Sequence, residues 1–195
     1  MQLESLFSDQ KWKILKEIAS QPQSPLQLSL KLNTTMANIS QQLKILEAVN
    51  LVKKEKVRNR DKGKPRTLFS LTADFALLVP LTKNFAEKKL VKATDHQKSI
   101  LRIWFLDDAA FAHEVETLYW KLNHLFKDIV AIIADQTHQS IHIVTESKEA
   151  KSEVSKFKGV QVASQKEFLA SFSKISSHKL ALIHGSSSIL QGGST

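Results

Sequence analysis

The sequence contains no cysteine among its 195 residues. That absence excludes a disulfide framework, a thiolate metal site and a cysteine nucleophile, and it is compatible with a reducing cytoplasm. No run approaches the roughly 20 apolar residues that a membrane-spanning helix needs. The opening MQLESLFSDQKWK lacks the apolar segment of a signal peptide. We therefore expect a cytoplasmic protein that does not enter a membrane.

The motifs of several enzyme classes are also missing. No glycine-rich loop ends in Lys-Ser or Lys-Thr, which excludes a Walker-type phosphate cradle. The segment HGSSS at 184–188 places a serine near a histidine but does not match the Gly-x-Ser-x-Gly arrangement of hydrolases. We expect no catalytic residue, no cofactor and no enzyme activity.

The positive charge is confined to one half of the chain. Residues 1–92 hold 17 Lys+Arg and 8 Asp+Glu, whereas residues 93–195 hold 11 of each, so the first half carries the whole net charge of +9. With 42% hydrophobic residues the chain can still build a core. This asymmetry indicates that one part meets a polyanion and the other part has a different task.

Two helices are predicted near the start of the chain. Residues 9–19 have apolar groups at helical spacing, namely Trp12, Ile14, Leu15 and Ile18. The segment QPQSP interrupts this helix. Ser24, Pro25 and Gln27 then have the spacing of a capping box with proline at the first helical position, which predicts a second, short helix.

A third helix and a hairpin are predicted next. Thr35 can cap a helix whose buried stripe is Ile39, Leu43 and Leu46. Asn50 tolerates the left-handed conformation that ends many helices. The pattern after it predicts a strand over 51–58, a turn around Gly63 and Pro65, and a return strand over 67–71.

This order of elements resembles the ArsR- and MarR-type transcription regulators of bacteria and archaea, over about residues 8–74. The resemblance is carried by Leu28, Leu32, Thr35, Ile39, Ser40, Leu43, Leu46, Leu51, Val52 and the strand LFSLT. The family usually has glycine at the position of Asn50, and it often has histidine or arginine near Gln41 and Gln42. The resemblance implies a winged helix-turn-helix that binds double-stranded DNA as a homodimer.

The third helix would then lie in the major groove, where short polar side chains read base edges. Asn38, Gln41 and Gln42 can bond bidentately to adenine. Phosphates would be held by Thr34, Thr35, Ser40 and Lys44. The alternative is that these polar groups are only solvated.

The hairpin has the larger electrostatic signal. Residues 53–66 hold eight cations against Glu55 and Asp61: Lys53, Lys54, Lys56, Arg58, Arg60, Lys62, Lys64 and Arg66. Alternate residues of a strand share a face, so Lys54, Lys56, Arg58 and Arg60 would form a clamp on the DNA backbone, with the tip reaching the minor groove. A solvated charged face is the alternative.

Residues 75–125 are predicted to be helical, with a kink or boundary at Pro80. This helical linker is a candidate dimer surface because it contains many large apolar side chains. The alternative is that these side chains only pack between the two domains. They are Phe75, Leu77, Leu78, Leu81, Ile100, Ile103, Trp104, Phe105, Tyr119, Trp120 and Leu125.

From residue 126 onward the pattern alternates between strands and helices, which predicts a small α/β domain that acts as a sensor or scaffold. This domain weakly resembles a degenerate nucleotidyltransferase-like domain of archaeal regulators. Active members bind magnesium through two aspartates on one strand, and here Ser140 and His142 stand at those positions. The resemblance therefore implies lost catalysis. Residues 186–195 are expected to be a loose tail.

Metal sensing, which some ArsR relatives perform, has thin support. His138, His142 and His184 are expected at strand ends, where they could converge, and His113 with Glu116 forms an i, i+3 pair on a helix.

We predict an α+β protein: a winged helix-turn-helix over 1–74, a helical linker over 75–125 and an α/β domain over 126–195. Its predicted function is DNA-binding transcriptional regulation, with an unknown small-molecule effector. The alternatives are a nucleic-acid-directed enzyme, a metal-responsive repressor or a protein-interaction module.

Overall fold

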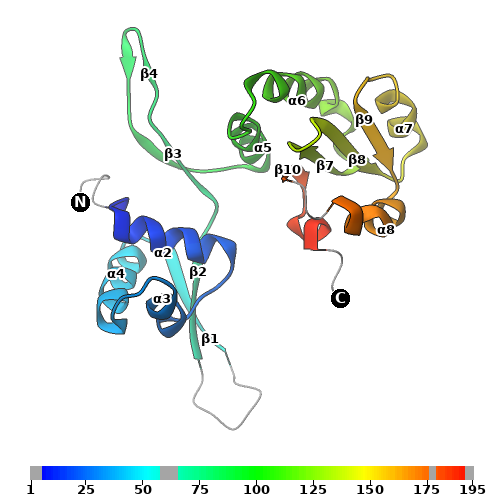
Figure 1. Ribbon diagram of the computed structural model, residues 1–195. Helices are drawn as coiled ribbons and strands as arrows, with labels where there is room; N and C mark the ends of the chain where they lie inside the picture. Colours follow the sequence, from blue (N-terminus) through cyan, green and yellow to red (C-terminus); the bar gives the residue numbers. More distant parts are fainter. Residues whose placement is uncertain (1–5, 58–65, 176–178, 192–195) are drawn as a thin grey trace. The chain divides into compact units, whose positions relative to one another are not determined.

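The computed structural model describes residues 6–57, 66–175 and 179–191. The chain forms two compact units, residues 1–93 and residues 94–195 (Figure 1). Each unit has a hydrophobic core of its own. Helices and strands occur in both units, which confirms the α+β class. Across the described ranges, no helix combines the length and the apolar character needed to span a bilayer.

The first unit opens with three helices and a hairpin: α2 (Asp9–Ser20), α3 (Pro25–Lys31), α4 (Met36–Ala48), β1 (Val52–Val57) and β2 (Arg66–Leu71). The strands are antiparallel, with Val52 opposite Leu71 and Val57 opposite Arg66. These elements confirm the helices and the hairpin predicted from the sequence. Their apolar faces meet in one core, which includes Ile14, Ile18, Leu28, Ile39, Leu43, Leu46 and Phe69.

Residues 75–92 form a second hairpin, here called the arm, so the helix predicted for this segment is wrong. Its strands are β3 (Phe75–Leu78), β4 (Leu81–Thr82), β5 (Phe85–Ala86) and β6 (Lys89–Lys92). The register is constant from the Phe75–Lys92 pair to the Thr82–Phe85 pair. Pro80 has no N–H and disfavours helical backbone at the preceding residue. Asn84, with φ of 66°, supplies the turn.

The second unit begins with two helices, and a four-stranded sheet follows. The elements are α5 (Asp95–Trp104), α6 (Ala109–Lys121), η1 (Asn123–Leu125), β7 (Ile129–Asp135), β8 (Ser140–Thr145), α7 (Lys148–Val154), β9 (Val160–Ala163), α8 (Gln165–Ile175), β10 (Leu180–Gly185) and η2 (Ser187–Gln191). The sheet order is β10-β7-β8-β9, and only the β8–β9 pair is parallel. The predicted strands and helices of the α/β part are confirmed.

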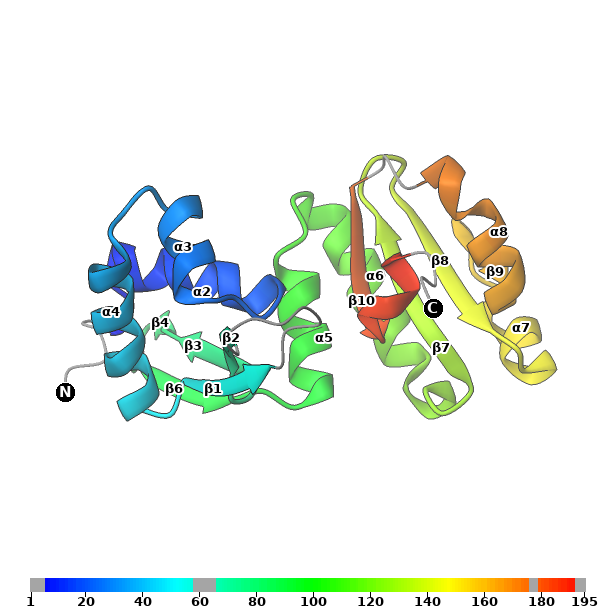
Figure 2. The same ribbon diagram turned by 90° about the horizontal axis from the view of Figure 1, so that it is seen from below.

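Helices cover both faces of this sheet (Figures 1 and 2). On one face, side chains of α5, α6 and α7 pack against Ile132, Ile141 and Ile143. On the other face, Phe168 of α8 and Ile189 of η2 pack against the sheet. Because both faces are covered, β7 and β8 are buried almost throughout.

Two expectations about the second unit change. Ile103, Tyr119 and Leu125 lie in its core, so they stabilise this unit and are not available as a dimer surface. The expected loose tail is partly ordered, because residues 187–191 form η2 and Ile189 is buried. Residues 192–195 lie outside the described residues.

Candidate nucleic-acid interface

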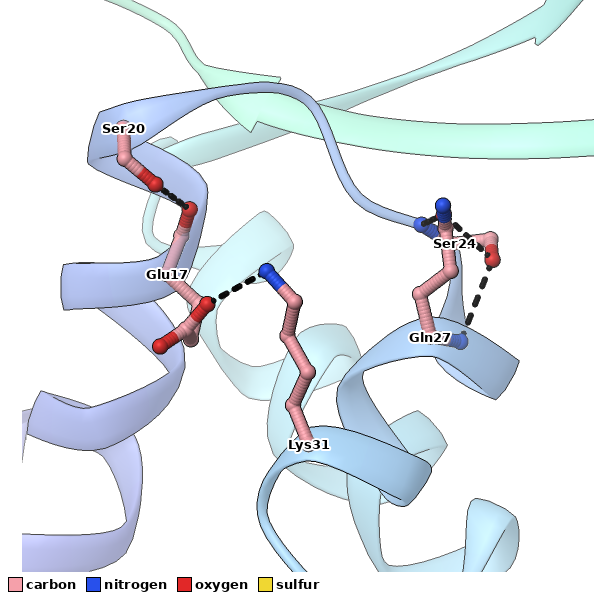
Figure 3. Close-up of polar contacts among 5 residues, drawn as sticks. All are labelled: Glu17, Ser20, Ser24, Gln27 and Lys31. Carbon is pink, nitrogen blue, oxygen red and sulfur yellow. Dashed lines mark hydrogen bonds and ion pairs between the residues drawn. The ribbon is translucent and has the colours of Figure 1, made fainter.

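Helix α3 is capped at its start by side-chain hydrogen bonds and is joined to α2 by an ion pair (Figure 3). The backbone N–H of Ser24 donates to the Gln27 carboxamide oxygen at 2.9 Å, and the Gln27 N–H donates to Ser24 Oγ at 3.3 Å. This reciprocal pair is the predicted capping box, with Pro25 at the first helical position. Lys31 Nζ then lies 2.9 Å from a carboxylate oxygen of Glu17 on α2.

Helix α4 begins and ends as its sequence predicts. Thr35 Oγ1 accepts a hydrogen bond from the Asn38 N–H at 3.2 Å, which caps the helix. Ile39, Leu43 and Leu46 are buried and bind the helix to the core. Asn50 has a φ of 59°, and the next N–H, that of Leu51, donates to Leu46 O at 3.0 Å. The chain can therefore turn directly from α4 into β1.

The face of α4 opposite its buried stripe is open to solvent. The exposed residues follow a spacing of four, three and four: Ala37, Gln41, Lys44 and Ala48. Small residues at both ends leave the amide of Gln41 and the ammonium of Lys44 as the polar groups of this row. The exposure of Gln41 and Lys44 is what a helix lying in a major groove requires.

Other predicted contact residues bind one another. The Asn38 carboxamide donates to Thr34 Oγ1 at 3.1 Å, and the Gln42 carboxamide donates to Asn38 Oδ1 at 3.5 Å. Ser40 Oγ donates to the Met36 carbonyl at 2.8 Å. Asn38 is only half-exposed. The sequence did not predict this Thr34–Asn38–Gln42 chain, which runs along one edge of the exposed face.

The β1–β2 hairpin places its cations beside α4. Every residue of β1 after Val52 is exposed. Lys53 pairs with Glu55 at 2.8 Å on one face of the strand. Lys54 lies on the other face with Lys56, and its Nζ is 3.0 Å from a carboxylate oxygen of Glu47 on α4. The Lys54 face of the hairpin therefore borders α4.

Only part of the predicted cationic clamp falls within the described residues. Lys53, Lys54 and Lys56 are exposed on β1, and Arg66 is exposed at the start of β2, opposite Val57. The other four predicted cations lie outside the described residues: Arg58, Arg60, Lys62 and Lys64.

Two further residues of this region were missed by the sequence analysis. Glu47 could have been suspected, because it is the only acidic residue on α4. Gln23 is buried, and its backbone exchanges two hydrogen bonds with Phe69 of β2, at 3.0 and 2.8 Å. No residue pattern predicts this bridge, which ties the segment before α3 to the hairpin.

The histidines expected to converge lie apart. His142 packs against Phe168 on the α8 side of the sheet, whereas His184 stacks on Phe126, with ring centroids 4.8 Å apart, on the α6 side. His138 contacts Asp135 at 3.2 Å. The predicted convergence is therefore wrong. Within residues 6–57, 66–175 and 179–191, no group of three His, Asp or Glu side chains is placed to hold a metal ion; this includes the predicted His113–Glu116 pair on α6.

The strand chemistry does not support the nucleotidyltransferase resemblance. β8 reads SIHIVT and contains no carboxylate. Ser140 stands opposite Asp135 and His142 opposite Ile133 in the antiparallel β7–β8 pair. A two-metal site needs several hard oxygen ligands, which this pair of strands does not provide.

Comparison with known proteins gives a family match within the first unit. Residues 8–54 match the family model of the bacterial regulatory protein, arsR family, a helix-turn-helix domain. The matched span runs from just before α2 to the start of β1. It supports a DNA-binding transcriptional regulator with an ArsR-like helix-turn-helix. The comparison gives no support to a nucleotidyltransferase-like second domain. No curated protein matches the chain.

Proposed function

We propose that the protein is a winged-helix regulator that occupies a promoter as a homodimer. Helix α4 lies in the major groove, and the β1–β2 hairpin acts as a wing on the DNA backbone. The second unit sets the geometry of the dimer or responds to a ligand.

The observation that carries this proposal is the junction of α4 with the hairpin. Glu47 and Lys54 join the two elements on one side of the unit. The exposed Gln41–Lys44 row and the exposed cations of β1 can therefore approach the same duplex. A polar helix face next to exposed cations fits a DNA groove, where the helix can contact base edges and the cations can contact phosphates.

The contacts within α4 divide the predicted residues by role. Gln41 has no hydrogen bond to any described side chain, so it is the first candidate for reading a base. The side chains of Asn38 and Gln42 are already hydrogen-bonded, Asn38 to Thr34 and Gln42 to Asn38. These bonds orient the two amides for a contact at the edge of the groove. Lys44, Lys54, Lys56 and Arg66 bind phosphates, as do the cations of residues 58–64.

Binding to duplex DNA across a salt series tests the proposal. We expect log K to fall with log salt by about 0.9 for each phosphate neutralised. Replacing Lys54 and Lys56 by glutamine should lower the affinity and reduce this slope by about 1 to 2, because Lys54 is shared between Glu47 and phosphate in the parent. Replacing Lys148 and Lys166, two exposed lysines of the second unit, makes the same charge change and should leave the slope intact. A slope near zero for the unaltered protein would contradict the wing.

Two rival functions predict different results. A nucleic-acid-directed enzyme would show nucleotide transfer that disappears when Ser140 and His142 are replaced. A protein-interaction module would keep its partner after Lys54, Lys56, Arg58 and Arg60 are all neutralised. Under our proposal the first pair of substitutions leaves DNA affinity unchanged, and the second set abolishes it.

A cavity in the second unit favours a ligand-responsive role. It has a volume of about 310 Å³ and lies between α5 and the end of β10. Its charged lining consists of Lys98, Arg102 and Asp95, so one positive charge is in excess. Ser186 and the half-buried His184 add hydrogen-bonding groups. Burial lowers the pKa of His184, so this ring is neutral at pH 7.

This lining suits a small ligand that carries an anionic group and hydroxyls. A thermal-shift screen of phosphorylated sugars and hydroxy acids tests the assignment. A ligand should raise the melting temperature of the unaltered protein and not that of the Arg102→Gln variant. A ligand that stabilises both proteins equally binds elsewhere, and its effect would argue against this cavity.

A further inference from the structure

The second unit has a groove between α6 and β9, the last strand in the order of its sheet (Figure 1). Its volume is about 320 Å³, at the lower end of the range for small-molecule sites. The groove shares no lining residue with the cavity between α5 and β10. It is therefore a separate feature that the proposed function does not involve.

The floor of the groove is apolar. Leu118 of α6 and Ile141 of β8 line it, and each is only 5% exposed. Phe157 and Val160 are half-buried and pack against the same core as these two residues. A ligand on this floor must offer an apolar surface, because polar groups placed there would lose water without gaining a hydrogen-bond partner.

One stripe of α6 forms a polar rim. Glu114, Thr117 and Lys121 are spaced three and four residues apart, so they lie on one face of the helix, and all three are exposed. The stripe is about 10 Å long at the rise of an α-helix. Glu114, with His113 beside it, therefore stands at one end of the groove and Lys121 at the other. Both Glu114 and Lys121 lie in the described range 66–175, and no ion pair joins them.

The positive charge gathers at the Lys121 end. Lys121 Nζ lies 5.4 Å from the centroid of the Phe157 ring, which holds the ammonium above the apolar floor. Lys158, the next residue along the chain from Phe157, also lines the groove and is exposed. Of the residues that the structure describes, none forms an ion pair with either lysine. Two cations at one end of an apolar floor attract an anionic group at that end.

We infer that this groove binds a small monocarboxylate with an apolar body. The carboxylate accepts hydrogen bonds from Lys121 and Lys158, while the apolar body covers Phe157 and Leu118. Glu114 sets the specificity at the far end, because its carboxylate repels a second negative charge there. The groove therefore selects ligands with one anionic group and disfavours dicarboxylates.

Amide NMR of the full chain, titrated with phenylpropionate, tests the inference. We expect saturable shifts of the amides of residues 113–121 and 157–160, with a dissociation constant of about a millimolar or below. Phenylpropanol has the same body without the charge and should bind about tenfold more weakly. A phenylpropionate with a second carboxylate on the ring should bind about threefold more weakly, and Glu114→Gln should remove this difference. The titrations are run at pH 8 to keep imidazole groups neutral.

Two further substitutions locate the ligand. Lys121→Gln should weaken phenylpropionate binding about five- to tenfold and leave phenylpropanol binding unchanged. Lys127→Gln makes the same charge change at an exposed lysine that does not line the groove, and it should change neither affinity. Thr117→Phe fills the middle of the groove from an exposed position on α6, so it should abolish binding while the melting temperature stays close to that of the parent.

Several results would overturn the inference. Absent shifts, or shifts confined to α5 and β10, would show that the acid does not occupy this groove. Equal affinities for phenylpropionate and phenylpropanol would exclude recognition of the carboxylate. Binding that survives Thr117→Phe would place the ligand elsewhere. None of these measurements uses DNA, so the failure of the proposed function and the failure of this inference are independent results.

Discussion

The carboxylate of Glu47 on α4 lies 3.0 Å from the ammonium of Lys54 on β1. Both side chains are partly exposed, so the pair contributes little to folding stability. Its effect on DNA binding should be larger under the proposed function, because it places a negative charge where α4 meets the β1–β2 hairpin, the two elements that we propose contact DNA. We therefore expect Glu47 to limit the attraction between this surface and phosphate.

Replacing Glu47 by glutamine should tighten DNA binding. The substitution removes the negative charge and frees Lys54 for a phosphate. We expect the affinity for duplex DNA at low salt to rise by about three- to tenfold and the slope of log K against log salt to steepen by about 1. The free energy of unfolding should change by less than about 1 kcal/mol. Fluorescence anisotropy with a labelled duplex measures both binding quantities.

Glu153→Gln is the matched control for this variant. Glu153 pairs with Lys156 at 2.8 Å in the second unit, so the same charge is removed outside the unit that contains α4. It should leave the salt slope unchanged. If Glu47→Gln and Glu153→Gln raise the affinity equally, the effect comes from net charge and not from the α4–wing junction.

The left-handed backbone at Asn50 makes a second prediction. Its φ of 59° suits asparagine and glycine, whereas alanine is strained there. Asn50→Ala should destabilise the first unit by about 1 kcal/mol, and Asn50→Gly should stay within about 0.5 kcal/mol of the parent. Urea unfolding in a Trp104→Phe, Trp120→Phe background makes Trp12 the only tryptophan reporter. Equal stability of the Asn50→Ala and Asn50→Gly variants would contradict a left-handed backbone conformation at residue 50.

Gly185 gives a third prediction, in the second unit. A Cβ at this position would lie 2.2 Å from the Val130 carbonyl oxygen. Gly185→Ala should therefore cost about 3 kcal/mol or more, because β10 must move away from β7. Gly159 also has a positive φ but has no atom within 4 Å of an added Cβ, so Gly159→Ala should cost only about 1 kcal/mol. Urea unfolding in a Trp12→Phe background follows both variants, and similar losses would mean that backbone conformation, not the close approach, requires Gly185.

Local patterns were sufficient for much of the fold. The Ser24 capping box, the Thr35 cap and the left-handed Asn50 each depend on a few adjacent residues, and all three are present. The strands of the second unit were predictable because their apolar runs are short and bounded by polar turns.

The predictions from sequence were wrong where the local structure depends on contacts between residues that are far apart in the sequence. The arm has apolar groups that also fit a helix, and its register depends on pairing between residues up to 17 positions apart, as in Phe75 and Lys92. His142 and His184 were expected to converge because sequence order does not show which face of a sheet a side chain takes. The Glu47–Lys54 pair was invisible for the same reason. Its two members are seven residues apart and belong to different elements.

The half-buried ring of His184 makes the stability of the second unit depend on pH. Burial lowers the pKa of His184 below its usual 6.5, while hydrogen bonding to the backbone of Phe126 and Ile129 and the charge of Asp95 oppose this effect. The unfolded chain then binds a proton more readily than the folded one, so stability is full above pH 6.5 and declines as pH falls toward the pKa of the folded state. Urea unfolding at pH 7 and pH 5, with Trp12 replaced by phenylalanine, should show this loss. His184→Gln should reduce it, whereas His113→Gln, at an exposed histidine of α6, should not. An equal pH dependence in the parent and the His184→Gln variant would show that other groups control the acid sensitivity of this unit.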